Sequence, residues 1–149
     1  MVDFDALDHE RFMREALRCA QEAKDRGDLP IGAVLVCDGA VAARGRNSIN
    51  SSRNQLRHAE IDALEAAREL VFSRHDDCVI YTTVEPCVMC LGTIAMADVR
   101  HVVFGAPDPR RGGTDMWRNV AYVRKEILRY EGGVLEAECL ALADGITQI

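Results

Sequence analysis

The 149-residue chain is 48% apolar and 28% charged, proportions that are ordinary for a globular protein, and it predicts one domain over residues 1–149. It has no stretch long and apolar enough to cross a membrane, and its acidic N-terminus lacks a signal peptide, so we expect a cytoplasmic protein without a membrane partner. The net charge of −6 argues against a broad basic surface for nucleic acids, although Arg53, Arg57, Arg110 and Arg111 could form a local basic patch.

The first part of the chain predicts a helix followed by a β-hairpin. Residues 8–26 carry apolar side chains at helical spacing, and Gly27 is typical of a helix C-terminus. Residues 31–37 form a short apolar run that is typical of a buried strand. Asp38-Gly39 favours a tight hairpin turn, so we expect residues 41–45 to return as a second strand.

The middle of the chain predicts helices and strands in alternation. After a polar loop, apolar residues at helical spacing favour a helix over residues 58–70. A strand over residues 77–84 leads into a helix over residues 87–97, with Pro86 at its start. Residues 100–104 predict the next strand, which should run parallel to the previous one because a helix connects the two.

The last part of the chain completes the predicted sheet. Residues 113–123 predict a loop with a short helix, residues 126–130 a fifth strand and residues 134–143 a final helix. A hairpin combined with parallel crossover strands makes the sheet mixed. We therefore predict an α/β fold, a three-layer α/β/α sandwich around a five-stranded mixed sheet. Ligands of such folds bind beyond the carboxyl ends of the strands.

Two short motifs at the starts of predicted helices carry potential metal ligands. They are His58-Ala59-Glu60 and Pro86-Cys87-Val88-Met89-Cys90. Positions 87 and 90 share one helix face, so both sulfurs can reach one ion. Imidazole and thiolate are common Zn²⁺ ligands, and three protein ligands leave a fourth position open for water, as in catalytic sites. We therefore predict one Zn²⁺ per chain, bound by His58, Cys87 and Cys90.

Glu60 is placed to act as the proton carrier of this site. Zinc lowers the pKa of a bound water to about 7, which makes a hydroxide nucleophile available at neutral pH. A carboxylate two residues from the histidine can take a proton from that water and later deliver it to a departing amine. The motifs predict an enzyme that removes an amino group by hydrolysis, with Glu60 as its catalytic residue.

The same residues allow other interpretations. A structural zinc site would need a fourth ligand, for which Cys78, His75 and His101 are candidates, and it would give Glu60 no role. A Cys-x-x-Cys pair can also be a redox site. Three further side chains could either line the substrate pocket or pack in the core: Phe104, Met116 and Trp117.

The two motifs together resemble the signature of the zinc-dependent cytidine deaminase superfamily. Three segments are similar to one branch, the bacterial tRNA adenosine deaminases, which are closely related to guanine deaminases: residues 29–36, 81–90 and 102–106. The resemblance covers roughly residues 8–143. It implies the same zinc site and proton carrier, a cytidine deaminase-like fold and a homodimer.

The resemblance also implies a set of substrate contacts. Asn47 would hydrogen-bond the substrate ring. The backbone amide of Ala59 and the backbone carbonyl of Glu85 would contact the base. Asp108 would lie near the nucleotide, as its counterpart does in the tRNA enzymes.

The chain also departs from the tRNA enzymes. Residues 51–57 lack the Asp-Pro-Thr found there, and the C-terminal end is not basic. Together with the acidic net charge, these differences favour a small-molecule substrate: a nucleobase, a nucleoside or a related heterocycle. The enzyme would convert its exocyclic amine to a carbonyl and release ammonia. The alternatives are a tRNA-specific adenosine deaminase, which makes inosine in an anticodon loop, and a non-enzymatic zinc-binding module. Several loops shape such a pocket, so the sequence does not specify the ring.

Overall fold

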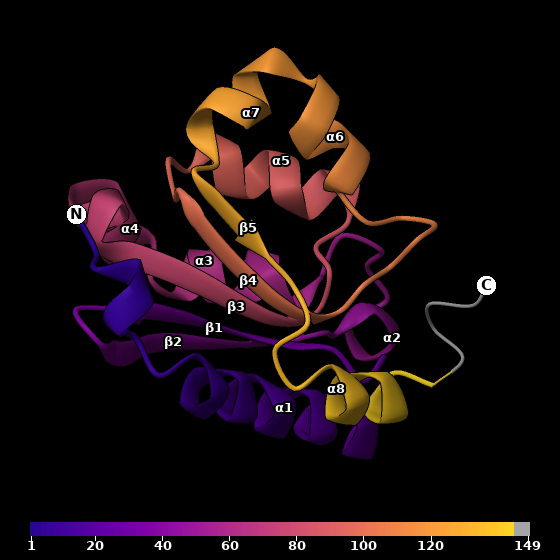
Figure 1. The fold of residues 1–149 in the computed structure, drawn as a ribbon. Coiled ribbons are helices and arrows are strands. Elements are labelled where there is room, and N and C mark those ends of the chain that lie inside the picture. Colours follow the sequence, from indigo (N-terminus) through magenta and orange to yellow (C-terminus); the bar gives the residue numbers. More distant parts are fainter. Residues whose placement is uncertain (145–149) are drawn as a thin grey trace.

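The computed structural model describes residues 1–144 and shows one sheet with helices on both faces (Figure 1). Its strands are β1 (Gly32–Cys37), β2 (Ala40–Arg46), β3 (Cys78–Val84), β4 (His101–Ala106) and β5 (Arg129–Glu131). They lie in the order β2-β1-β3-β4-β5. β1 is antiparallel to β2 and β3, whereas β3, β4 and β5 run parallel. The predicted five-stranded mixed sheet is therefore confirmed.

The first two strands form the predicted hairpin. Asp38 and Gly39 connect them with φ angles of 53° and 75°. Two successive positive φ angles are typical of the two-residue turn whose twist matches that of the strands. All six residues of β1 are buried, because helices cover this strand on both faces.

Helices cover the two faces of the sheet. α1 (His9–Asp25) and α8 (Glu136–Leu142) pack on one face, and α3 (Ala59–Ala66), α4 (Arg68–Arg74), α5 (Val88–Met96) and α7 (Ala121–Glu126) on the other. The remaining elements are α2 (Ile49–Ser52), α6 (Thr114–Asn119) and two 3₁₀ turns, Phe4–Ala6 and His75–Asp77. No helix within residues 1–144 is long and apolar enough to cross a membrane.

Strands β1, β3 and β4 contribute alternate side chains to two separate cores. Val34 and Val36 pack in the core under α1, whereas Leu35 and Cys37 pack in the core under α3 and α5. Successive side chains of a strand point to opposite faces. The continuous apolar run over residues 31–37 therefore reflects burial on both sides.

Several elements differ from those expected from the sequence: α2 lies in the expected polar loop, and residues 113–123 hold α6 and the start of α7 rather than one short helix. The helix expected over residues 58–70 is interrupted at Ala67, whose φ and ψ of −107° and 22° separate α3 from α4. Leu64 and Val71 reach the same core on either side of the break, so the apolar spacing conceals it. The fifth strand is shorter than residues 126–130, because α7 runs to Glu126 and the amide of Ile127 bonds to the carbonyl of Val123 at 2.9 Å.

Candidate metal centre and active site

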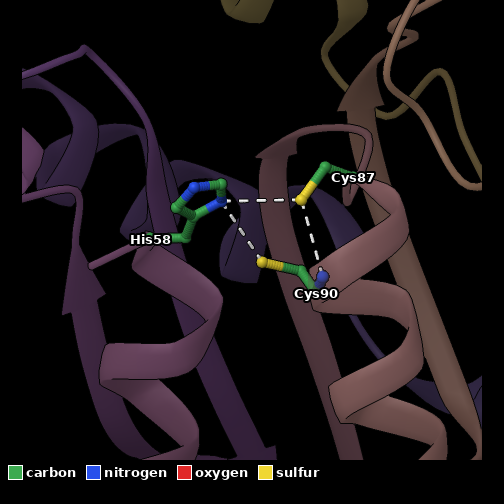
Figure 2. A group of neighbouring side chains, drawn as sticks. All are labelled: His58, Cys87 and Cys90. Carbon is green, nitrogen blue, oxygen red and sulfur yellow. Dashed lines mark hydrogen bonds between the residues drawn. The ribbon is translucent and has the colours of Figure 1, made fainter. Parts of the chain in front are cut away.

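Three potential metal ligands lie together at the starts of α3 and α5 (Figure 2). The Nδ1 atom of His58 lies 3.5 Å from the sulfur of Cys87 and 3.4 Å from the sulfur of Cys90. All three ligand atoms lie within 4.8 Å of one another. His58 is the N-cap of α3 and Cys87 the N-cap of α5, so Pro86 lies just outside the helix rather than at its first position. The expected grouping of the three ligands is present.

The environment of these side chains suits a cation. The Nε2 atom of His58 lies 3.0 Å from the carbonyl oxygen of Gln55. Because a carbonyl only accepts hydrogen bonds, Nε2 carries a proton and Nδ1 is the nitrogen available to a metal. The thiol of Cys90, by hydrogen bonding, lowers the pKa of Cys87 to about 4, so Cys87 is a thiolate at neutral pH. One imidazole nitrogen and two sulfurs fit Zn²⁺.

The group has three members, not four, among residues 1–144. Cys78 begins β3, whereas Cys87 follows the end of that strand, and a seven-residue strand spans about 20 Å. His75 precedes Cys78, and His101 begins the parallel strand β4, so both lie toward the same distant end. A structural zinc site therefore lacks its fourth ligand within the described part of the chain.

Glu60 lies in the first turn of α3, next to the ligand group, and is only 4% exposed. Burial raises the pKa of its carboxyl group to about 7, because desolvation disfavours the charged form. A carboxyl group that titrates near neutral pH can both accept and return a proton. This environment matches the proton-carrying role expected of Glu60.

His58, Cys87 and Glu60 line a cavity of about 450 Å³, a volume that suits a small heterocycle. Apolar side chains form part of its lining: Leu29, Ile31, Ile49 and Val84. Of the residues expected to contact substrate, Asn47, Glu85 and Asp108 line the cavity. Ala59 is fully buried between His58 and Glu60, and its substrate contact stays a prediction.

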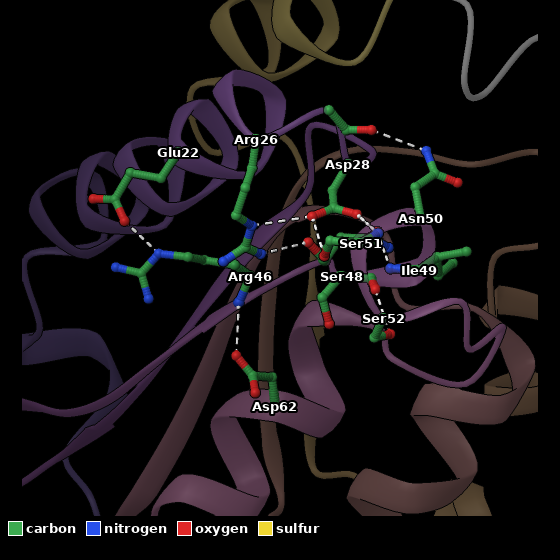
Figure 3. Close-up of polar contacts among 12 residues, drawn as sticks. Glu22, Arg26, Asp28, Arg46, Ser48, Ile49, Asn50, Ser51, Ser52 and Asp62 are labelled. Atoms are coloured by element: carbon green, nitrogen blue, oxygen red, sulfur yellow. Dashed lines mark hydrogen bonds and ion pairs between the residues drawn. The ribbon is translucent and has the colours of Figure 1, made fainter.

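One wall of the cavity, residues 47–50, is held by Asp28 (Figure 3). The carboxylate of Asp28 accepts hydrogen bonds from the amide and hydroxyl of Ser51 at 2.8 and 2.7 Å, and from Arg26 at 3.0 Å. Arg26 also donates to the backbone carbonyl of Asn47 at 3.1 Å. The side-chain oxygen of Asn47 accepts from the amide of Ile49, which leaves its NH₂ group as the donor for a ligand. No local sequence pattern marks Asp28, because its partner Ser51 lies 23 residues away.

The opposite wall is the loop over residues 107–113. Asp108 is buried, and its carboxylate accepts from the amides of Arg110 and Arg111, both at 3.1 Å. Arg111 also lines the cavity, with Nε 3.6 Å from the Asp108 carboxylate. The side chain of Glu85 accepts from the amide of Asp108 at 3.1 Å. Two buried carboxylates, Asp28 and Glu85, therefore support the two walls.

The four arginines of the expected basic patch have different surroundings. Arg57 forms ion pairs with Asp62 at 3.1 Å and Glu65 at 2.7 Å, so nearby acidic groups offset its charge. Arg53 is exposed at the end of α2, just beyond the residues of the first wall. Arg110 is exposed on the second wall. Positive side chains therefore lie near both walls of the cavity.

The three side chains that could have lined the pocket pack against other side chains instead. Met116 and Trp117 pack against the core under α5. Trp117 stacks on Tyr130 with ring centroids 5.3 Å apart, and its Nε1 donates to the carbonyl of Ile127. Phe104 is 7% exposed and packs its ring against Tyr130.

Comparisons with known proteins agree with this site. A family model described as the cytidine and deoxycytidylate deaminase zinc-binding region matches residues 7–106. The chain is 37% identical over 135 residues to a protein named tRNA-specific adenosine deaminase from Bacillus subtilis, with 87% of this chain and 83% of the relative covered.

Two solved structures are also similar. One comes from a study of A-to-I editing by tRNA:A34 deaminases, with a TM-score of 0.79 and 34% identity over 89% of this chain and 98% of that one. The other is a guanine deaminase from Bacillus subtilis, with a TM-score of 0.64 and 34% identity over 77% of this chain and 78% of that one. The chain therefore belongs to the cytidine and deoxycytidylate deaminase family, as a zinc-dependent hydrolase that replaces the exocyclic amine of a base or related heterocycle by a carbonyl.

Proposed function

We propose that this protein is a tRNA-specific adenosine deaminase, which converts adenosine to inosine in an anticodon loop. The observation that carries the proposal is the group of His58, Cys87 and Cys90 beside buried Glu60, at the wall of a cavity. Arg111 lines this cavity, and Arg53 and Arg110 are exposed near it. A relative 37% identical over most of the chain is named for a tRNA substrate. The net charge of −6 favoured a free small molecule, but the named relatives do not support that preference.

In this proposal, His58, Cys87 and Cys90 hold zinc, whose chemistry when bound is to activate a water molecule as a nucleophile. Glu60 accepts a proton from the attacking water on its carboxylate oxygen. It then delivers that proton to the departing amino group, which leaves as ammonia. The pKa of about 7 suits both halves of this exchange at neutral pH.

The remaining wall residues orient the base. The NH₂ group of Asn47 donates to an acceptor on the adenine ring, and its oxygen stays bonded to Ile49. The amide of Ala59 and the carbonyl of Glu85 contact the base from the starts of the two metal-bearing segments. Asp108 lies beside the nucleotide on the opposite wall. Together these groups hold the exocyclic amine near Glu60.

The test compares matched substrates under identical conditions. An anticodon stem–loop with adenosine at the first anticodon position should yield inosine, with kcat/KM at least about 100-fold above that of free adenosine, because contacts along the loop contribute to transition-state binding. Free guanine and cytidine serve as competitors, and the same stem–loop with guanosine at that position is the control. Faster ammonia release from guanine than from the stem–loop would contradict the tRNA assignment.

We also propose that the protein is a homodimer that associates through the face of α4 and α5. Phe72 is 88% exposed and Met96 71%, and both line a shallow groove with Leu64 and Val71. Covering these side chains with a second copy removes apolar surface from water. Sedimentation should show a dimer for the wild type and a monomer for Phe72→Asp. A monomeric wild type at micromolar concentration would refute the proposal.

A further inference from the structure

We propose that the Glu85 side chain is a positioning residue, which holds the cavity wall carrying Asp108 and Arg111 and thereby sets substrate affinity. This inference rests on the proposed function, which places Asp108 beside the substrate. It concerns the Glu85 carboxylate, not the backbone carbonyl that the family resemblance assigns to the base. The side chain takes no part in the proton transfer that we assign to Glu60.

The Glu85 carboxylate is buried, with the residue 6% exposed, and it accepts four hydrogen bonds. One oxygen accepts from the amide of Asp108 at 3.1 Å. The other accepts from the amide and hydroxyl of Thr114, at 3.0 and 2.6 Å, and from the hydroxyl of Tyr130 at 2.7 Å. A buried carboxylate is costly unless donors satisfy it, so this arrangement is specific for a carboxylate.

Three of these four donors lie at the two ends of one loop, and the fourth, Tyr130, lies in β5. Asp108 begins the turn that continues through the amides of Arg110, Arg111 and Gly112. Thr114 is the first residue of α6 and ends the same loop. The Glu85 carboxylate therefore joins the start of the loop to its end. Loss of this bridge should free the backbone that presents Asp108 and Arg111 to the cavity.

The loop is also tied to the start of α5, independently of the Glu85 side chain. The amide of Val88 bonds to the carbonyl of Arg111 at 3.2 Å, and the amide of Gly113 bonds to the carbonyl of Pro86 at 2.9 Å. Gly112 packs so closely on Glu85 that a Cβ atom there would overlap the carboxyl group. Because these backbone contacts remain when Glu85 is changed, its substitution should alter the loop without displacing Cys87.

Glutamine is an informative substitution at this position. Its side chain has nearly the same shape, but it offers one acceptor oxygen and one NH₂ donor. In either orientation the NH₂ group faces at least one of the four donors. Glu85→Gln should therefore break hydrogen bonds at one end of the loop while it keeps the packing. Glu131→Gln is the matched control, because Glu131 is an exposed carboxylate whose partner is Arg129 at 2.9 Å.

The main experiment is a double-mutant cycle on the binding of the anticodon stem–loop. The Glu60→Ala background removes turnover, so fluorescence anisotropy reports binding alone. We expect Glu85→Gln to weaken binding about tenfold when Asp108 is present, and about twofold or less when Asp108→Asn is already in place. Glu131→Gln should change nothing. A general loss of stability would weaken binding by the same factor whether or not Asp108 is present. Equal losses of affinity in the two backgrounds would therefore overturn the inference.

Two measurements keep the inference testable without that substrate. Zinc content should be unchanged in Glu85→Gln. Hydrogen exchange should accelerate at the amides of Asp108 and of residues 110–112, while that of Leu91 in α5 stays slow. If Glu85→Gln fails to fold, Tyr130→Phe removes one donor that does not itself line the cavity, and it should accelerate the same amides to a smaller degree. Unchanged exchange in these amides would overturn the inference, whatever the substrate. If the wild type does not deaminate the stem–loop but exchange at these amides is accelerated in Glu85→Gln, the result would count against the proposed function and not against this inference.

Discussion

The two walls of the cavity are each supported by one buried carboxylate, but the two supports differ in kind. Asp28 shares its hydrogen bonds between Ser51 and the charged Arg26, whose side chain is 46% exposed. Glu85 accepts only from backbone amides and hydroxyl groups in the contacts found within residues 1–144. The first wall thus depends on an ion pair that reaches solvent, and the second on uncharged donors.

The two walls should therefore respond differently to ionic strength and pH. Salt screens exposed ion pairs and affects hydrogen bonds to neutral donors much less. Asp28 also acts on Asn47 through Arg26, whereas Glu85 bonds directly to the amide of Asp108. The wall that carries Asn47 should therefore be the more sensitive to pH and ionic strength.

The largest expected effect comes from a residue that lies between the walls and supports neither. Glu60→Ala should lower kcat by about 10²–10⁴-fold, because it removes the proton carrier. Zinc content should stay at one ion per chain, and stem–loop affinity should change little, since both wall carboxylates remain. Steady-state kinetics and metal analysis check this prediction. A variant with full zinc and unimpaired turnover would remove Glu60 from the mechanism.

Glu60 should also destabilise the metal-free protein above neutral pH. Its folded-state pKa is raised, so the folded protein binds more protons than the unfolded chain between pH 4.5 and about 7, and stability falls across that range. A rise of the pKa from 4.5 to about 7 corresponds to about 3 kcal/mol. Metal-free Glu60→Gln should therefore be more stable than the metal-free wild type at pH 8, by up to that amount, and little different at pH 4.5. Urea denaturation at the two pH values checks this, and equal stabilities at pH 8 would contradict it.

Asp28→Asn tests the ion-paired wall. Burial raises the pKa of Asp28, but hydrogen bonds from Ser51 and Arg26 outweigh that effect and lower it overall. A lowered folded-state pKa gives stability that is present above the ordinary pKa, near 4, and lost as the pH falls below it. We expect a loss of about 2 kcal/mol at pH 7 in urea denaturation, shrinking toward pH 3. Exposed Asp25→Asn is the control, and a loss that does not depend on pH would argue against the ionised carboxylate.

The smallest expected effect compares one arginine near each wall, Arg53 and Arg110. Arg53→Ala and Arg110→Ala should each weaken stem–loop binding, by about 1 kcal/mol at low salt, if each side chain neutralises one phosphate. Each should also reduce the slope of log K against log salt concentration by about 0.7–0.9. Arg57→Ala should change the slope less, because Asp62 and Glu65 already pair with Arg57. An unchanged slope in one of the first two variants would place RNA on the other wall only.

Much of the fold and the reaction centre could be predicted from local sequence patterns. The ligands Cys87 and Cys90 lie within one helical turn, so helix geometry alone brings their sulfurs together. His58 and Glu60 likewise flank the start of one helix. The hairpin at Asp38-Gly39 and the parallel pairing of β3 with β4 follow from turn chemistry and from the short helical connection.

The walls of the cavity depend on contacts between residues that are distant in sequence. Asp28 meets Ser51 after 23 residues, and Glu85 meets Tyr130 after 45. The sequence around Asp28 and Glu85 does not show whether their carboxylates are buried or exposed to solvent. Nor did it show that Trp117 packs on Tyr130 rather than facing the cavity. The sequence alone determined the order of the elements and the zinc-binding motifs, because these depend on spacing within single turns and strands. Only the tertiary structure decided which buried carboxylates shape the cavity, because the donors that satisfy them come together when the sheet has assembled.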